Sequence, residues 1–402
     1  MTAFPPVYSE IPLKAFRSAL SPCASGDSLE AFTKDRLEGE YPGRKVCFAE
    51  NGTSALAIAL SCSTATPAAR VALPAYCCPD VGAAALYVGA SIVLYDLDPQ
   101  TLEPDESSFR SALKTGCTHA VVSHLYGRIL NVPVWIAIAA EYGVVLIEDA
   151  AQHAGGRLAH LRAGGLADWG VLSFGRGKGL NAGGGGALLV RHDLATPELL
   201  GRITGVASAN RSRGVALLLK AGLTELFSQP QIYGFFRKNK KLGIGQTRFV
   251  PLLEVAPFSS AGMSLLLHAL TTEPRELEIR QRRAQWYREQ LDGISMGQFT
   301  VLPAESDGSL RFPLKWPDDQ QPKSLMDQLE NSGLASLGVV QSYPRTLLDY
   351  PELRGKILPS HSPLSGATAL ASRTITLPTH SRIGDSAART IIERLRRAVK
   401  NN

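Results

Sequence analysis

The chain lacks the features of a secreted, membrane-spanning or nucleic-acid-binding protein. Its first residues, MTAFPPVYSEIPLKAF, are interrupted by prolines and contain no apolar core, so they do not predict a secretory signal. No uninterrupted apolar run is long enough to cross a bilayer. The formal charge of +6 is small, and no basic helix with interleaved aromatic residues accompanies it. We therefore expect no nucleic-acid partner.

Metal and disulfide patterns are missing as well. The six cysteines all lie in the first third of the chain and show no paired CxxC spacing, and the vicinal pair Cys77-Cys78 is not a structural-zinc pattern. The histidines, among them His119 and His153, show no ligand spacing, so we predict no metal site. A disulfide framework is not expected in a chain of 402 residues, which predicts a reducing, cytoplasmic location.

Short apolar runs alternate with helix-like stretches between about residues 45 and 195, in a chain with 45% hydrophobic and 19% charged residues. The apolar runs are Val71–Tyr76, Ile92–Leu97, Ala120–Leu125, Val144–Glu148, Gly170–Phe174 and Ala187–Val190. The helix-like stretches are Ser54–Leu60, Val81–Tyr87 and Val132–Tyr142. This alternation predicts an α/β domain with a mainly parallel sheet. Because the runs are apolar throughout, we expect the strands to be covered on both faces.

The pattern changes after Val190. Residues 200–250 contain an apolar stretch, Gly214–Phe227, followed by the basic run Arg237–Lys241. We interpret this excursion as helices packed on a dimer; the alternative is contact with an anionic membrane surface. Further helices and strands are predicted at about 262–271, Pro274–Leu291, Leu310–Trp316, Lys323–Ser332, Ser336–Gln341 and Ser386–Lys400. We therefore predict a large α/β domain over residues 1–275 and a smaller C-terminal α+β domain over residues 276–402.

Two strand ends carry groups that suit one kind of chemistry. The run Val145–Asp149 ends in a carboxylate, at the edge where open α/β sheets bind ligands. By itself Asp149 would be interpreted as the cap of the next helix. The following apolar run ends at Ser173-Phe174, and Lys178 comes shortly after it among glycines. These glycines suit close approach of the backbone to a cofactor, although a flexible hairpin would also explain them.

Together these groups meet the needs of pyridoxal phosphate (PLP). Its chemistry requires a lysine to form the imine, an acid to keep the pyridine nitrogen protonated, and donors for the phosphate. Lys178 and Asp149 supply the first two. The donors are expected at a helix N-terminus, where free N–H groups and the helix dipole favour an anion. The stretch Asn51-Gly52-Thr53-Ser54 has this form, although by itself it is also a common helix cap.

The chain resembles the DegT/DnrJ/StrS-type aminotransferases, the sugar aminotransferase family with the fold-type-I PLP architecture. The matching stretches run in family order across most of the chain: NGTSAL (51–56), VALPAYCCPDVGAAALYVGA (71–90), YDLDPQTLEPD (95–105), VSHLYGRILNV (122–132), LIEDAAQHAGG (146–156), WGVLSFGRGKGLNAGGGGALLV (169–190), RQRRAQWYREQL (280–291) and SYPRTLLDYP (342–351). The resemblance implies a large, mainly parallel sheet domain, a smaller C-terminal α+β domain and a homodimer.

The resemblance also implies roles for individual residues. Lys178 resembles the Schiff-base lysine, and Asp149 resembles the partner of the pyridine nitrogen. Gln152 resembles the residue that hydrogen-bonds the ring hydroxyl of the cofactor. The phosphate ligands that the resemblance implies are Gly52, Thr53 and Ser173. His124 and Tyr126 lie in a segment that the resemblance places near the cofactor, where we expect contact with the substrate.

Four positions depart from the family pattern. Cys78 stands where the family has an aromatic residue that stacks on the cofactor ring. Gly184 stands in Gly183–Gly186, where the family has an acidic residue. Ser260 and Gly262 stand where the family has the Asn and Arg of a Gly-x-Asn-x-Arg stretch. These departures concern the groups around the cofactor and leave the lysine and its acid partner in place.

We therefore predict a PLP-dependent aminotransferase. By resemblance, it moves an amino group from an amino acid, with glutamate as the expected donor, to a keto sugar, expected to be nucleotide-linked. One alternative is a PLP enzyme that acts on a non-sugar ketone or as a lyase or dehydratase. Another is a family member that has lost efficient catalysis and acts as a binding or regulatory partner.

Overall fold

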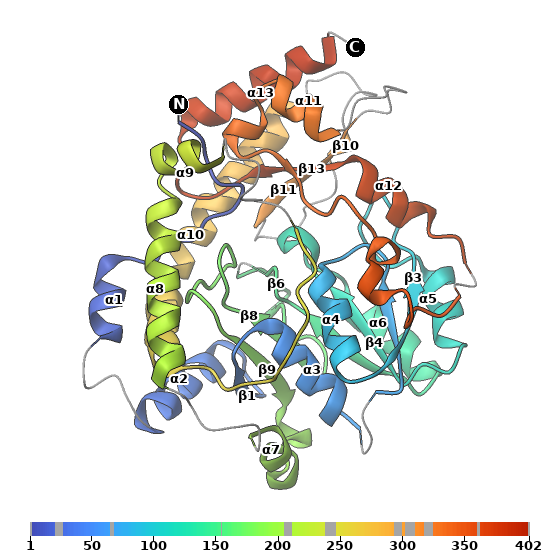
Figure 1. Cartoon of the computed structure of the whole chain (residues 1–402). Helices are drawn as coiled ribbons and strands as arrows, with labels where there is room; N and C mark the ends of the chain where they lie inside the picture. The colour runs from blue at the N-terminus through green and yellow to red at the C-terminus, as the bar shows by residue number, and fades with distance from the viewer. Residues whose placement is uncertain are drawn as a thin grey trace.

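The centre of the molecule is a seven-stranded, mostly parallel sheet. The computed structural model describes residues 2–20, 27–64, 68–153, 155–204, 211–237, 247–292, 300–301, 310–316, 325–359 and 362–400. The strands of the large sheet are β1 (Arg44–Ala49), β2 (Arg70–Pro74), β3 (Ser91–Tyr95), β4 (His119–Ser123), β5 (Val145–Asp149), β8 (Trp169–Ser173) and β9 (Gly186–Arg191). Their order is β1-β9-β8-β5-β4-β2-β3 (Figure 1). The prediction of a mainly parallel sheet is confirmed, because only β9 runs against its neighbours in this sheet.

Strand β1 is an addition to the six predicted strands. It lies at the edge of the sheet, begins with Arg44 and Lys45, and is only partly buried. A strand of this kind lacks the continuous apolar run by which the interior strands were predicted.

Helices cover both faces of the large sheet. They are α3 (Gly52–Cys62), α4 (Pro79–Tyr87), α5 (Glu106–Leu113) and α6 (Val132–Glu141). Helices α3 and α4 lie on one face, while α5 and α6 lie on the other (Figure 1). This arrangement follows from right-handed crossovers, because the chain reverses its direction across the sheet after β3. The carboxyl ends of the parallel strands therefore meet at one edge, together with the amino ends of these helices.

One long helix, α10 (Ser260–Asp292), joins the two halves of the molecule. Two separate helices were predicted here, ending and beginning near Pro274, and this prediction is wrong because the helix continues through the proline. An interior proline removes a backbone hydrogen bond and costs about 3 kcal/mol. Packing of both halves offsets that cost, since Leu266 is buried in the core of the large sheet and Tyr287 in the core of the small one.

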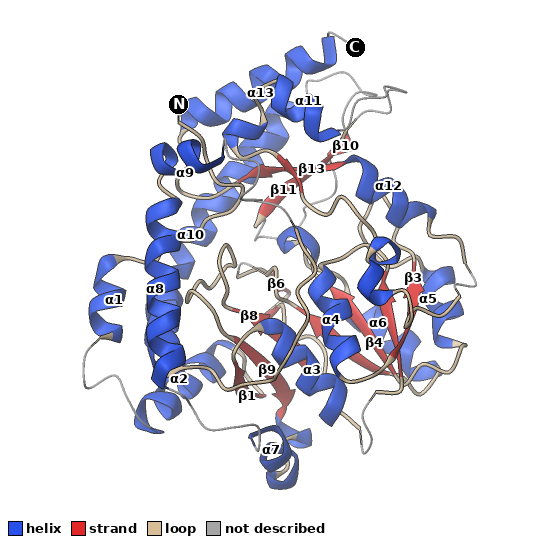
Figure 2. Cartoon of the chain, in the orientation of Figure 1, coloured by secondary structure: helices blue, strands red, loops and turns tan. Residues whose placement is uncertain are grey.

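The C-terminal part forms a second, antiparallel sheet of order β10-β11-β13-β12 (Figure 2). Its elements are β10 (Thr300–Val301), β11 (Arg311–Lys315), α11 (Leu325–Asn331), β12 (Val340–Gln341), α12 (Ser365–Arg373), β13 (Thr374–Pro378) and α13 (Asp385–Lys400). The strand predicted at Ser336–Gln341 is shorter, because Ala335–Leu337 forms a 3₁₀ turn. The core around the large sheet also includes residues from beyond position 276, such as Leu353 and Leu370. The division into residues 1–275 and 276–402 stays a prediction.

The remaining helices lie around the two sheets, with α9 near the C-terminal part (Figure 1). They are α1 (Leu13–Ala19), α2 (Asp27–Glu40), α7 (Pro197–Thr204), α8 (Arg211–Phe227) and α9 (Pro230–Arg237), and a two-stranded hairpin is formed by β6 (Arg157–Leu158) and β7 (Leu161–Arg162). Helix α8 packs against α10 but leaves Val215, Leu219 and Leu223 exposed. Of the predicted basic run, Arg237 ends α9 and positions 238–241 fall outside the described residues. None of the described helices is long and apolar enough to span a membrane.

Candidate active site

The amino end of α3 meets the carboxyl end of β8. Asn51 caps the helix, because its side chain accepts a hydrogen bond from the Ser54 N–H at 2.7 Å. A Cβ atom on Gly52 would lie 2.9 Å from Cβ of Ser173, so a larger residue does not fit without a shift. The first N–H groups of a helix have no acceptor within it. The buried Ser54 hydroxyl also has no partner among the described residues. These groups form a cradle suited to an anion such as a phosphate.

Asp149 lies at the carboxyl end of β5 and is 7% exposed. One carboxylate oxygen accepts a hydrogen bond from the Ser123 hydroxyl and the other from the Ala151 N–H, both at 3.0 Å. No described lysine, arginine or histidine forms an ion pair with it. A buried carboxylate without a cation is costly, so its position suits a cationic group of a ligand.

Lys178 lies in the loop between β8 and β9, and the N-terminal segment holds that loop in place. The Ser9 hydroxyl donates to the Lys178 carbonyl at 2.6 Å, and the Ser9 carbonyl accepts from Asn181 Nδ2 at 2.7 Å. Buried Arg280 of α10 donates to the Ser9 hydroxyl at 2.8 Å. Gly177 has a φ of +73°, a conformation that favours glycine. The backbone of Lys178 is therefore fixed by contacts from two distant parts of the chain.

Three charged residues act electrostatically on the Cys78 thiol. Burial raises the pKa of Cys78 to about 12, Asp80 and Asp149 contribute to the rise, and the Lys178 ammonium opposes it. Burial also raises the pKa of Asp80, while Lys178 lowers it. Lys178 and Asp149 therefore both lie within electrostatic reach of the Cys78 thiol. Asp80 was not among the predicted site residues, although it is an acidic residue that follows the end of a parallel strand.

Gln152 holds a strained turn. Its side-chain oxygen accepts a hydrogen bond from the Tyr126 N–H at 3.1 Å. Tyr126, in the 3₁₀ turn η1 (Leu125–Gly127), has φ 61° and ψ 13°, which is rare for a residue with a side chain. Such strain is concentrated at functional sites. With its oxygen engaged, Gln152 keeps its amide N–H groups to donate to a ligand.

His124 is engaged inside the protein. Its Nδ1 accepts from the Leu130 N–H at 3.1 Å, and its Nε2 contacts the Glu148 carboxylate at 2.7 Å. The side chain is 1% exposed. Glu148 also accepts hydrogen bonds from the backbone N–H groups of Gly164, Leu166 and Ala167. This geometry favours a structural role for His124, and its contact with substrate stays a prediction.

Phe258 accounts for one departure from the family pattern. A Cβ atom on Gly262 would lie 2.2 Å from the Phe258 ring, and one on Gly185 would lie 2.3 Å from it. The ring is buried and also contacts Phe174. An arginine at position 262 therefore cannot coexist with this ring. Phe258 was not singled out from the sequence, because its contacts join segments far apart in the chain.

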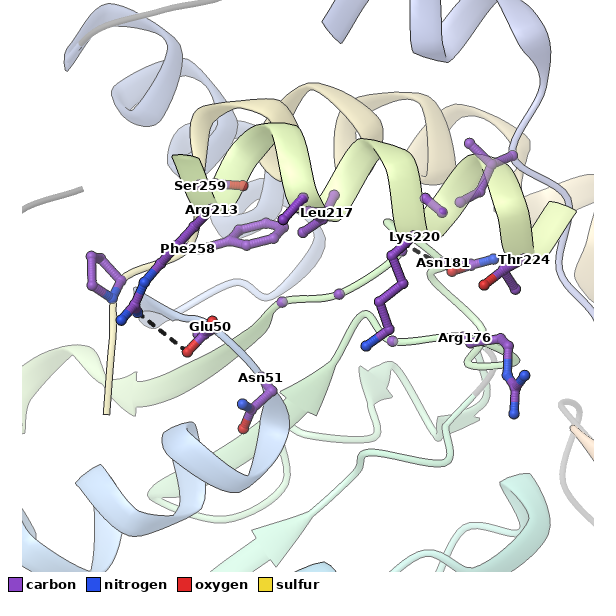
Figure 3. Close-up of a pocket in the computed structure, with 18 of the residues that line it drawn as sticks. Glu50, Asn51, Arg176, Asn181, Arg213, Leu217, Lys220, Thr224, Phe258 and Ser259 are labelled. Atoms are coloured by element: carbon purple, nitrogen blue, oxygen red, sulfur yellow. Dashed lines mark hydrogen bonds and ion pairs between the residues drawn. The ribbon is translucent and has the colours of Figure 1, made fainter. Parts of the chain in front are cut away.

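A cavity of about 780 Å³ lies between the glycine-rich loop and α8 (Figure 3). Lys220 points into it, and Arg213 at its rim pairs with Glu50 at 3.4 Å. Asn51 lines the same cavity, so the cavity extends to the amino end of α3. Lys178 is not among its lining residues.

Solved structures of low sequence identity share this fold. DesI, solved with its TDP-sugar product, has a TM-score of 0.76 and 21% identity, covering 100% of this chain and 94% of that one. The E. coli GDP-4-keto-6-deoxy-D-mannose-3-dehydratase, solved with bound hydrated PLP, has a TM-score of 0.74 and 15% identity. The match covers 99% of this chain and 100% of that one. The fold is therefore that of the fold-type-I PLP-dependent transferases.

The sequence identifies the family within that class. The profile of the DegT/DnrJ/EryC1/StrS aminotransferase family matches residues 17–214 and 260–396, and the chain belongs to this family. The L-glutamine:2-deoxy-scyllo-inosose aminotransferase of Streptomyces lividus is 32% identical over 157 residues, 39% of this chain and 37% of that protein. The UDP-N-acetyl-3-dehydro-alpha-D-glucosamine 3-aminotransferase of Acidithiobacillus ferrooxidans is 32% identical over 143 residues, which are 36% of this chain and 39% of that protein. The matches thus span less than half the length of these relatives.

Proposed function

We propose that this chain is a PLP-dependent aminotransferase that transfers an amino group from an amino acid, with glutamate as the expected donor, to a keto sugar, expected to be nucleotide-linked. The observation that carries the proposal is the meeting of three features at the carboxyl edge of the sheet. The Asp149 carboxylate and the cradle of Gly52 and Ser173 lie at the ends of the neighbouring strands β5 and β8, and Lys178 follows β8 in the chain. The names of the two relatives support it, since both describe amino transfer to a sugar or cyclitol ring.

The residues present fit PLP. Gly52, Thr53 and Ser173 would hold its phosphate in the cradle at the amino end of α3. Asp149, which has no cation partner among the described residues, would accept the N–H of the pyridinium ring. The amide N–H groups of Gln152 would donate to the ring hydroxyl, and Cys78 would pack on the ring face. When bound, PLP supplies an electron sink for the bonds at the substrate carbon that carries the amine.

Lys178 performs the proton transfer in this proposal. Its Nζ would hold the cofactor at rest and then carry the proton between the donor carbon and the cofactor as general base and acid. The anchoring of the Lys178 carbonyl by Ser9 keeps the amine in reach of the site.

A second candidate function is elimination at the same site. The dehydratase of the same fold shows that this architecture also accommodates the loss of water from a keto sugar. Amino transfer is favoured because the family is one of aminotransferases, and because Lys178 would supply the acid and base that amino transfer needs. A homodimer and a cytoplasmic location belong to this proposal as well.

The proposal is tested by cofactor loading. Purified protein is mixed with PLP and then separated from the unbound cofactor, and it is expected to keep a visible absorbance band. Borohydride should then fix the cofactor on Lys178, and peptide mapping should locate it there. Lys178→Ala should lose both signals while remaining folded. A colourless wild type that stays colourless with added PLP would overturn the proposal and favour a binding or regulatory role. Pyridoxamine-phosphate-loaded protein, offered keto sugars and non-sugar ketones, then shows which acceptor receives the amine.

A further inference from the structure

Lys220 is a cation without a carboxylate partner in the cavity between the glycine-rich loop and α8. It points from α8 into this cavity (Figure 3). Three glutamates also line the cavity, and each already has an arginine partner: Glu50 and Glu254 pair with Arg213, and Glu225 pairs with Arg382. Among the residues that the structure describes, Lys220 forms no ion pair. Its ammonium can therefore bind an anion from outside the chain.

The face of α8 that carries Lys220 lies directly on the glycine-rich loop. A Cβ atom on Gly183 would lie 2.7 Å from Cβ of Ala221. A Cβ atom on Gly184 would lie 3.1 Å from Cδ1 of Leu217. Residues three and four apart share one face of a helix, so Lys220 is on the same face as these two contacts. The loop therefore fixes the position from which the Lys220 side chain enters the cavity.

The same glycine tract is packed against the amino end of α3. A Cβ atom on Gly186 would lie 2.5 Å from the carbonyl carbon of Asn51 and 2.6 Å from the Gly52 nitrogen. Asn51 itself lines the cavity. The first N–H groups of α3 have no acceptor within the helix, and the buried Ser54 hydroxyl has no partner among the described residues. One cavity thus extends from the Lys220 ammonium to the uncharged donors of a helix N-terminus.

This combination of groups suits a phosphate. A phosphate monoester carries a charge of about −1.5 to −2 at pH 7 and three acceptor oxygens. It can therefore accept hydrogen bonds from a helix N-terminus and from a lysine ammonium at the same time. The cavity volume of about 780 Å³ lies within the range of pockets that enclose a whole small molecule. The phosphate is thus expected to be part of a larger ligand.

We propose that Lys220 binds a phosphate group of a ligand that lies between α8 and the amino end of α3. Two molecules in the proposed reaction carry phosphate, the cofactor and a nucleotide-linked acceptor, and in this respect the inference rests on the proposed function. The family profile matches residues 17–214 and 260–396, so Lys220 lies outside it. This phosphate contact is therefore specific to this chain and its α8 segment.

The first measurement is calorimetric titration of the unloaded protein with inorganic phosphate. Lys220→Gln, which removes the charge, is compared with the charge-retaining Lys220→Arg. The matched control is Lys114→Gln, because Lys114 is an exposed lysine at the C-terminal end of α5 and does not line the cavity. Lys220 is exposed as well, so all three variants should keep the urea midpoint of the wild type.

Lys220→Gln is expected to weaken phosphate binding by about 5- to 20-fold, between the effect of an exposed ion pair and that of a hydrogen bond to a charged group. Lys220→Arg should weaken it by less, and Lys114→Gln should leave it unchanged. The difference between Lys220→Gln and the wild type should shrink at high salt, because salt screens an exposed charge. A wild type that binds no phosphate, unchanged binding in Lys220→Gln, or an equal loss in Lys114→Gln would overturn the site.

Two further titrations distinguish the source of the phosphate. If Lys220 holds the cofactor, Lys220→Gln should weaken binding of PLP but not of pyridoxal, which has no phosphate. If Lys220 holds the acceptor, the variant should bind PLP normally, and PLP-loaded protein should bind inorganic pyrophosphate, used in place of the nucleotide diphosphate, more weakly. Unchanged binding of both PLP and pyrophosphate would overturn the proposal. If the wild type takes up no PLP, the proposed function fails, and the titration of unloaded protein with inorganic phosphate still tests Lys220.

Discussion

Replacement of Asp149 by Asn tests the centre of the proposed site. The change removes one negative charge and keeps the size of the side chain. The Asn oxygen can still accept from the Ala151 N–H, and the Ser123 hydroxyl can rotate to accept from the new amide. The fold should therefore keep its stability, since no buried hydrogen bond is left unmade.

Cofactor binding should respond very differently. In the proposed complex the carboxylate accepts the N–H of a pyridinium ring in a site where Asp149 itself is 7% exposed. A hydrogen bond to a charged group contributes about 1.5–3 kcal/mol, which corresponds to a rise of about 10- to 150-fold in the dissociation constant for PLP. The neutral Asn also stops favouring the protonated ring, so the rate of amino transfer should fall by more than the binding does.

The assay is a titration of the unloaded protein with PLP, followed by the visible band and by quenching of tryptophan fluorescence. Asp105→Asn is the matched control: Asp105 caps α5 by accepting from the Ser108 N–H at 2.8 Å, and Asn caps helices equally well. The control should bind PLP as the wild type does. If Asp149→Asn binds PLP with unchanged affinity and transfers amino groups at the same rate, Asp149 does not face the ring nitrogen and the assignment is refuted.

Three further predictions follow from single contacts. Gly52→Ala places a Cβ atom 2.9 Å from Cβ of Ser173, so it should weaken PLP binding and abolish the competition of inorganic phosphate with PLP. The control Gly39→Ala, where nothing lies within 4 Å of the added Cβ atom, should leave PLP binding and this competition unchanged. Ser9→Ala leaves a hydrogen bond of buried Arg280 unmade, so it should lower the free energy of unfolding, measured by urea titration, by about 1.5–3 kcal/mol. It also removes the bond to the Lys178 carbonyl, so borohydride trapping of the cofactor at Lys178 should be slower. An unchanged urea midpoint and trapping rate would contradict this role of Ser9. Burial lowers the pKa of His119 to about 4. Between about pH 6.5 and 4 the unfolded chain therefore binds a proton at this residue that the folded chain does not bind. The free energy of unfolding should fall by about 1.4 kcal/mol for each unit by which the pH is lowered in that window. His119→Gln should remove that part of the slope, and an identical slope in the variant would show that His119 is not buried in its neutral form.

The positions of the main strands and the order of the chemical groups could be predicted from the sequence. Strands such as Val145–Asp149 are continuous apolar runs, and their pattern depends only on neighbours in the chain. Lys178 and Asp149 could be paired because parallel strands place their carboxyl ends at one edge. The identification of the family followed from the same local motifs and is confirmed.

Other features depend on contacts between distant segments. The continuity of α10 through Pro274 contradicts local propensity, because buried residues on both halves of the helix outweigh the lost hydrogen bond. The close approach of the Phe258 ring to Gly262, which leaves no room for a Cβ atom unless the ring moves, is likewise seen only in the tertiary structure.

The sequence by itself therefore determined the family and the class of chemistry, and it predicted Lys178 as the lysine that holds the cofactor, since each rests on short local motifs. Only the tertiary structure decided what surrounds that lysine. Ser9 and Arg280 anchor its loop from far along the chain, and Asp80 adds a carboxylate beside it. These neighbours are separated by up to hundreds of residues, and only burial of the two cores brings them within reach of one another.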